Sequence, residues 1–296
     1  MSHSMSEPIT GNGNQPSDSP GVVETPRRRS PLPIALIAVL FVLVSFLTWY
    51  GTWFGRKLTD QEIEKYLADV QKPRHVQHAL FQIEERIENE DQSVKRWYPQ
   101  VLALAGHPET EYRLVAAWVM GADNTSADFH AALLRLVEDP EPMVRRNAAL
   151  ALVRFGDAHG RKELLEMLRP FAVVAPAEGV LSSTLDEGQQ VARGSLLARI
   201  RRGEQTLEVR SPLSGKISDV VAREGAQVVA GEVILMIGPN SSNVWEALRG
   251  LSLVGGREDL PDVERYAQGV EAMPERVKEQ AALTVKAIQS RSEKNQ

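Results

Sequence analysis

The chain has 296 residues, a length typical of about two domains. With 43% hydrophobic and 25% charged residues, it has the composition of a folded protein. The net charge of −5 argues against a general nucleic-acid-binding protein, which needs a cationic face. The absence of cysteine excludes disulfides, thiolate metal sites and a cysteine nucleophile.

The N-terminal part divides into a polar tail and an apolar segment. Residues 1–30 are rich in Ser, Pro, Gly and Asn, which predicts a disordered tail. Residues 31–55 contain no charged side chain and predict a transmembrane helix, with 33–54 as the membrane contact. At about 1.5 Å per residue the apolar stretch spans roughly 33 Å, against a bilayer core of about 30 Å.

The orientation of this segment depends on the basic residues at its two ends. Arg27, Arg28 and Arg29 precede it and favour a cytoplasmic N-terminus. Arg56 and Lys57 follow it and leave the orientation open. We expect a single-pass membrane protein whose C-terminal domains are periplasmic or otherwise extracytoplasmic.

Residues 56–170 predict an array of short helices with an internal repeat. Asp139-Pro140-Glu141 repeats His107-Pro108-Glu109, and Val144-Arg145 repeats Tyr112-Arg113. Pairs of short helices bury their apolar faces by stacking on neighbouring pairs. The second unit resembles the HEAT repeat family, which implies a structural role for Asp139 and Arg145 in tying adjacent turns together. His107 stands at the position of Asp139, where we expect it to cap the turn.

Residues 171–239 predict a β-domain that is internally duplicated. Gly179 in the first half recurs as Gly215 in the second, and Gly194 recurs as Gly231. Such glycines permit sharp turns or close strand contacts. The two halves resemble the biotinyl/lipoyl domain family, which implies a small β-sandwich of the barrel-sandwich hybrid type.

One position departs from that family. Carrier domains present a lysine on the hairpin between their halves, and the alignment places Glu204 there. A carboxylate cannot form the amide that holds biotin or lipoate, so we expect an unmodified domain and no cofactor. Unmodified domains of this type occur in the membrane-fusion-protein adaptors of export systems, and the chain resembles that family distantly.

After the β-domain, residues 240–290 return to a helical pattern. Val277-Lys278 and the alanines that follow repeat the pattern of Val144-Arg145 and its alanines, so the same helix type resumes. Either the β-domain is inserted in the array or it is appended to it; we favour the insertion. Residues 291–296 are expected to be a frayed tail.

The sequence carries no catalytic motif and no cluster at metal-ligand spacing, so we expect neither an enzyme nor a metal site. His75 and His78 are interpreted as part of a solvated helix face. Arg199, Arg201 and Arg202 make the end of the β-domain cationic and are the candidate partner contacts. Binding of nucleic acid or an envelope polymer through arginines is a weaker interpretation.

The predicted fold class is therefore multidomain α plus β, with one transmembrane helix, a HEAT-like helical array and an inserted lipoyl-like β-sandwich. The predicted function is a single-pass membrane-anchored scaffold or adaptor that presents both modules to protein partners. A transport or envelope complex is the partner that the resemblance implies. The alternative is a carrier or regulatory subunit of a biotin- or lipoate-dependent enzyme. The oligomeric state and the identity of the partner stay open.

Overall fold

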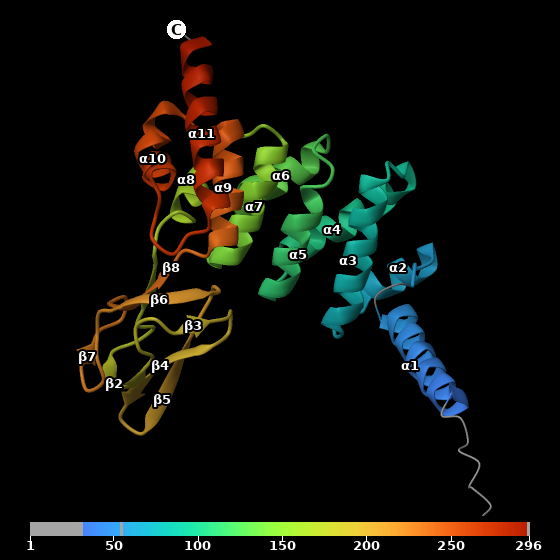
Figure 1. Cartoon of the computed structure of the whole chain (residues 1–296), viewed down its shortest axis with the longest axis horizontal. Coiled ribbons are helices and arrows are strands. Elements are labelled where there is room, and N and C mark those ends of the chain that lie inside the picture. Colours follow the sequence, from blue (N-terminus) through green and yellow to red (C-terminus); the bar gives the residue numbers. More distant parts are fainter. Residues whose placement is uncertain (1–31, 54–55, 295–296) are drawn as a thin grey trace, which may run out of the picture. The chain divides into compact units, whose positions relative to one another are not determined.

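The computed structural model describes residues 32–53 and 56–294 (Figure 1). The chain divides into two compact units, Met1–Arg56 and Lys57–Gln296. The tail predicted over residues 1–30 lies outside the described residues.

The first unit contains the helix α1 (Leu32–Trp53). We expected a transmembrane helix over residues 31–55, and this expectation is wrong. Among the described residues, no helix has both the length and the apolar character that a membrane crossing requires. The expected membrane contact through residues 33–54 and the expected single-pass topology depend on this helix and are withdrawn as well.

The second unit contains an array of helices. Its main helices α3, α5, α7, α9 and α11 form a row in which each packs against the next, and the shorter helices pack against this row (Figure 1). The helices before the β-domain are α2 (Asp60–Ala68), α3 (Pro73–Glu88), the 3₁₀ turn η1 (Gln92–Trp97), α4 (Tyr98–Ala105), α5 (Thr110–Met120), α6 (Ala127–Leu136), α7 (Pro142–Arg154) and α8 (Arg161–Glu166). Those after it are α9 (Ser241–Val254), the 3₁₀ turn η2 (Arg257–Asp259), α10 (Leu260–Gln268) and α11 (Glu275–Lys294).

Local sequence signals account for where several helices begin. Thr59 and Glu62 form a capping box at the start of α2, which satisfies two backbone N–H groups. Proline occupies the first turn of α3, α4, α7 and α10, where its missing N–H costs no helical bond.

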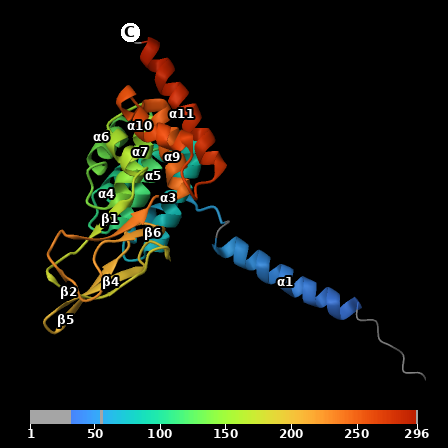
Figure 2. The same ribbon diagram turned by 60° about the vertical axis from the view of Figure 1, so that its left-hand side comes forward.

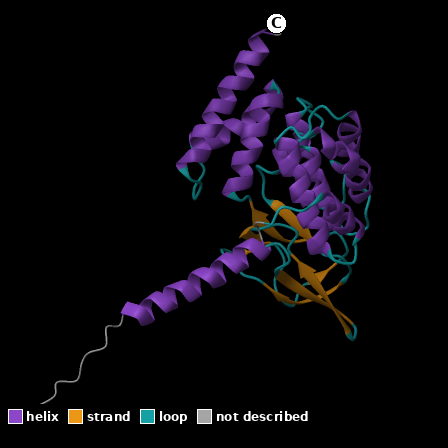
Figure 3. Cartoon of the chain, turned by 90° about the vertical axis from the view of Figure 1, so that its right-hand side faces the viewer, coloured by secondary structure: helices purple, strands orange, loops and turns teal. Residues whose placement is uncertain are grey.

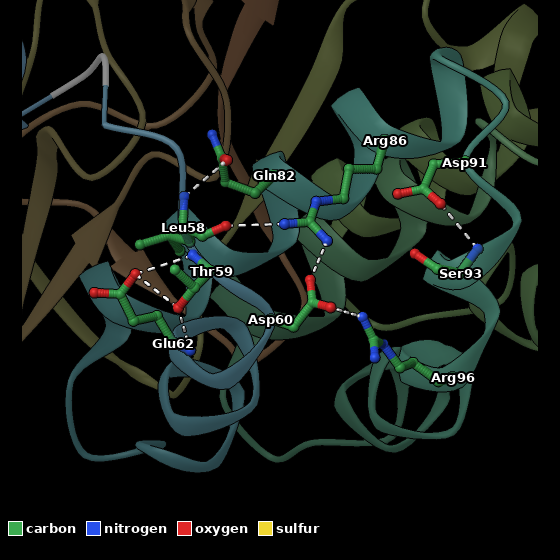
Figure 4. A network of polar contacts seen from close by, with 9 residues as sticks. All are labelled: Leu58, Thr59, Asp60, Glu62, Gln82, Arg86, Asp91, Ser93 and Arg96. Atoms are coloured by element: carbon green, nitrogen blue, oxygen red, sulfur yellow. Dashed lines mark hydrogen bonds and ion pairs between the residues drawn. The ribbon is translucent and has the colours of Figure 1, made fainter.

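A polar network fastens the first residues of the array (Figure 4). The Asp60 carboxylate accepts hydrogen bonds from Arg86 Nη1, at 2.6 Å, and from Arg96 Nη2. Arg86 Nη2 also donates to the Leu58 carbonyl oxygen at 2.8 Å. Both guanidinium groups lie over the ring of the buried Trp97. The network therefore joins the start of α2 to α3 and η1.

The β-domain consists of two four-stranded antiparallel sheets (Figure 2). One sheet has the order β1-β8-β6-β3 and the other β5-β4-β2-β7, so equivalent strands of the two sequence halves occupy equivalent places. The strands are β1 (Phe171–Val174), β2 (Gly179–Thr184), β3 (Gln190–Val191), β4 (Leu196–Arg202), β5 (Gln205–Arg210), β6 (Gly215–Val220), β7 (Gln227–Val228) and β8 (Val233–Gly238). Side chains of both sheets form a core of their own, with Leu181, Ile200, Ile217 and Ile234 fully or almost fully buried.

The β-domain interrupts a continuous helical array. Its first and last strands, β1 and β8, are paired, with Phe171 opposite Ile237, so the chain enters and leaves at one place. The helix α9 packs on α7 and α8, and one hydrophobic core includes residues from Leu58 to Ile288 while omitting the strands. The grouping of the strands apart from the helices is visible in Figure 3. The β-domain is thus an insertion between α8 and α9.

Two further contacts define the C-terminal part of the array. The Tyr266 hydroxyl of α10 donates to the Leu168 carbonyl oxygen at 2.6 Å, across the insertion. Arg291 donates to the carbonyl oxygens of Ser252 and Gly255, both at the end of α9. The helix α11 therefore continues to Lys294, beyond residue 290, where we expected a frayed tail to begin. The last two residues of that tail lie outside the described residues.

Candidate protein-interaction surfaces

Asp139 and Arg113 form the connection between successive helical units. Arg113 donates through Nε and Nη2 to the two carboxylate oxygens of Asp139, at 2.7 and 3.0 Å, and both side chains are largely buried. Asp139 also accepts the Glu141 backbone N–H at 2.9 Å. Burial acts to raise the pKa of Asp139, but these hydrogen bonds outweigh it and hold the pKa below its usual range. Asp139 therefore has a structural role: it is buried, ionised and paired with Arg113.

Arg145 repeats the arrangement one unit later. Arg113 Nη1 donates to the carbonyl oxygens of residues 107 and 108, and Arg145 Nη1 donates to those of residues 139 and 140. Arg145 Nε then bonds to Glu163 Oε2 at 2.8 Å. His107 Nδ1 accepts the Glu109 N–H at 3.0 Å, as Asp139 does with its own turn, so the capping role expected for His107 is confirmed.

The four glycines of the duplicated β-domain occupy matching backbone positions. A Cβ atom on Gly179 would lie 2.6 Å from a carbonyl oxygen of β4, and one on Gly215 would lie 2.7 Å from a carbonyl oxygen of β8. Gly194 and Gly231 have φ of +84° and +85°, a conformation that side-chain-bearing residues rarely adopt. The first pair therefore allows close strand packing, and the second pair allows the turns.

Glu204 lies at the end of the hairpin that joins β4 to β5. Arg202 and Gln205 are paired, so Gly203 and Glu204 alone form the loop. Gly203 has φ of +60°, as expected for the first position of a tight two-residue hairpin. Glu204 is exposed at the place where the family's carriers present a lysine. Lys216, the lysine of this domain, pairs with Gln190 and Gly238 on the other sheet.

The three candidate contact arginines do not form one uniform cationic patch. Arg199 lies opposite Glu208 on β5 and forms an ion pair with it at 3.7 Å. Arg202 forms an ion pair with Glu178 at 3.3 Å, and both side chains are exposed. Arg201 lies opposite Thr206 and is exposed. Two of the three charges are thus partly compensated.

A second surface, which sequence reasoning missed, is a groove in the helical array. It has a volume of about 590 Å³ and is lined by residues of α5, α7, α9 and α11. Trp118, Leu150, Val153 and Leu253 supply apolar surface, and Leu253 is 64% exposed. Gly250 lies where α9 meets α7 and α8, since a Cβ there would be 3.2 Å from Val153 and 3.0 Å from Leu164. We refer to this feature as the array groove.

Two arginines that line the array groove each lie near a tryptophan ring, and of the two rings only that of Trp118 lines the groove. The Arg154 guanidinium is 5.7 Å from the ring centroid of Trp118, and that of Arg249 is 4.8 Å from Trp245. Arg154 Nη1 donates to a carbonyl oxygen at 3.4 Å, and Arg249 is 4.0 Å from Glu246. An arginine has five N–H donors. Most donors of both groups are therefore available to a ligand of the array groove.

The Trp118 indole is fixed in place from its other edge. Its Nε1–H donates to Glu84 Oε1 of α3 at 2.5 Å. Partial burial raises the pKa of Glu84 above its usual range, although this hydrogen bond opposes the shift. The ring is thus held between α3 and α7 while remaining 42% exposed. The one sequence signal for this site was that Trp118 and Leu150 occupy equivalent positions in successive repeat units.

Several of the described histidines contact neighbouring side chains of the helical array. His75 Nδ1 lies 3.0 Å from Asp69 Oδ2 and its ring stacks on Tyr66. His130 and His159 both contact the carboxylate of Asp157. Within the described ranges, no group of three or more His, Cys, Asp or Glu side chains could hold a metal ion.

Comparisons with known proteins identify both modules. Residues 83–179 match the family profile of HEAT repeats, and residues 172–238 match that of the RND MFP barrel-sandwich hybrid domain. The two resemblances read from the sequence are confirmed. The chain thus combines HEAT repeats with an adaptor-type β-domain.

Two individual proteins are similar to parts of this chain. A 64-residue segment is 42% identical to "Putative efflux system component YhbJ" of Bacillus subtilis (strain 168), covering 21% of this chain and 28% of that protein. A solved structure of a single-chain, multi-domain long-chain acyl-CoA carboxylase is 18% identical with a TM-score of 0.24. It covers 34% of this chain and 11% of the other, and at that TM-score it supports no argument.

Proposed function

We propose that the protein is a non-enzymatic adaptor that connects protein partners in a transport or envelope complex. The observation that carries this proposal is the barrel-sandwich hybrid domain, whose profile is that of RND MFP proteins. The efflux-system name of the Bacillus relative supports the same class. An adaptor of this kind is associated with the cell envelope through its partners.

The architecture supports this role because it provides two independent binding modules in one chain. The helical array and the β-domain each have a separate hydrophobic core. An ion pair of 2.9 Å between Arg193 and Glu111 connects them outside the covalent linkers. Each module can therefore hold its own partner, and linking two binding events raises their combined affinity.

The alternative, a biotin or lipoate carrier, has no support at the hairpin. The loop residues are Gly203 and Glu204, and neither can form the amide that carriers use. Lys216 is on a different strand, β6, in the other sheet. We therefore favour an unmodified β-domain that acts through its surface.

Co-purification of the full chain tests the proposal. The chain, tagged at its C-terminus, is isolated from native cells in mild detergent, and its partners and intact mass are measured by mass spectrometry. We expect a stoichiometric transport or envelope complex and the mass of the unmodified chain. The substitutions R201E and R202E together should reduce partner recovery, whereas R135E on the exposed side of α6 should not. Recovery of the chain alone, or with biotin- or lipoate-dependent enzymes, would contradict the proposal.

A further inference from the structure

We propose that the array groove binds an acidic amphipathic helix of a partner protein. This inference rests on the adaptor function proposed above, because it names the chemistry of one partner. It concerns the helical array and is independent of the β-domain.

The composition of the array groove resembles that of an interaction hot spot. Tryptophan and arginine are the side chains that dominate binding energy at protein interfaces. Here Trp118 is 42% exposed and Leu253 is 64% exposed, and both line the array groove beside Arg154 and Arg249. In the helical array, the large apolar side chains described as exposed on helices are Phe81, Trp118, Leu253 and Leu283, all on the main row. The exposed apolar side chains of the array's helices thus lie on the row of main helices.

The arginines of the array groove favour an acidic partner. Arg154 and Arg249 contribute two positive charges, and Glu246 lies 4.0 Å from Arg249. Glu84, which accepts the Trp118 N–H, interacts with Arg154 and compensates part of its charge. Each guanidinium lies within 6 Å of the centroid of an indole ring, and both arginine side chains are exposed. A guanidinium with free donors binds a carboxylate by two parallel hydrogen bonds. An anionic side chain beside an apolar one therefore matches this surface.

The walls of the array groove favour a helix as the occupant. They are helices whose backbone N–H and C=O groups are bonded internally, so an extended peptide would find no backbone partners to pair with. A helix satisfies its own backbone and presents apolar residues at i, i+3, i+4 and i+7 to a groove. Glu or Asp at the edges of that apolar face would meet the two arginines.

A charge-reversal experiment tests this inference. Two fluorescein-labelled helical peptides share a leucine face at i, i+3, i+4 and i+7; one carries Glu beside that face and the other carries Lys. Fluorescence anisotropy with the full chain should show that the Glu peptide binds at least about tenfold more tightly. The double substitution R154E/R249E should reverse this preference, because the groove charge changes sign. The matched variant R135E, on α6, should leave it unchanged.

Each outcome decides the inference. Equal binding of the two peptides, no binding of the Glu peptide, or an unchanged preference in R154E/R249E would overturn it. Reversal is informative even if the variant is somewhat destabilised, since a loss of folding would weaken both peptides alike. If the peptides fail while an envelope complex co-purifies, the groove inference falls and the adaptor proposal stands. If the peptides behave as expected and no complex is recovered, the groove inference stands and the adaptor proposal falls.

Discussion

At the scale of single residues, the buried ion pair between Asp139 and Arg113 is a sensitive point of the helical array. In D139A, Arg113 would lose its two hydrogen bonds to the carboxylate and keep those to the carbonyl oxygens of residues 107 and 108, while remaining largely buried. Removing one partner of a buried ion pair costs about 3–5 kcal/mol. We expect a loss near the lower end of this range in the free energy of unfolding, measured by urea denaturation. The neighbouring exposed residue provides the control E138A, which should stay within about 0.5 kcal/mol of the parent.

The same carboxylate predicts a pH dependence. Burial works to raise the pKa of Asp139, but the bonds from Arg113 and the Glu141 N–H bring it below the ordinary value of 3.8. The unfolded chain then binds the proton more readily, so the stabilisation is present above about pH 3.8 and is lost as the pH falls through the folded pKa. In D139N, stability should fall less steeply below that pH than in the parent. Equal slopes would contradict the assignment.

At the scale of elements, Gly179 and Gly215 allow the strands of the β-domain to pack more closely than a Cβ atom would permit. A Cβ on Gly215 would lie 2.6 Å from Ile237 Cγ2 and 2.7 Å from the Gly238 carbonyl oxygen. Overpacking of this kind costs about 1–3 kcal/mol. Because the two modules have separate cores, G215A should lower the calorimetric transition of the β-domain and leave that of the helical array in place. Gly106, whose Cβ would have no neighbour nearer than 3.8 Å, supplies the control G106A. A shift of both transitions would show that the cores are coupled.

The sequence predicted these elements where a repeat made the pattern visible twice. The match of His107-Pro108-Glu109 with Asp139-Pro140-Glu141 located the helical units, and the recurring glycines located the halves of the β-domain. The array groove was not predictable in this way, because its walls come from segments on both sides of the insertion. Trp118 precedes the β-domain and Leu253 follows it, and no local spacing indicates that they line one surface. The transmembrane prediction rested on the length and apolar composition of residues 31–55, and no helix among the described residues meets both requirements.

At the scale of the whole molecule, the position of the insertion explains how two modules can coexist. The β-domain enters and leaves the array at paired strands, so it adds little constraint to the path from α8 to α9. The helices before and after it share one core and continue one row. The array can therefore keep its own surface while the β4–β5 hairpin presents a second one. This arrangement fits the adaptor role proposed above.

Excision of the β-domain tests this account most directly. Because paired antiparallel residues have Cα atoms about 5 Å apart, a short Gly-Ser linker can replace residues 171–238. The excised chain should retain the helical transition in calorimetry. Co-purification from native cells should then lose at least one component of the complex recovered with the full chain and keep those bound by the array. Recovery of the same proteins in the same ratio, from a folded excised chain, would contradict the adaptor function.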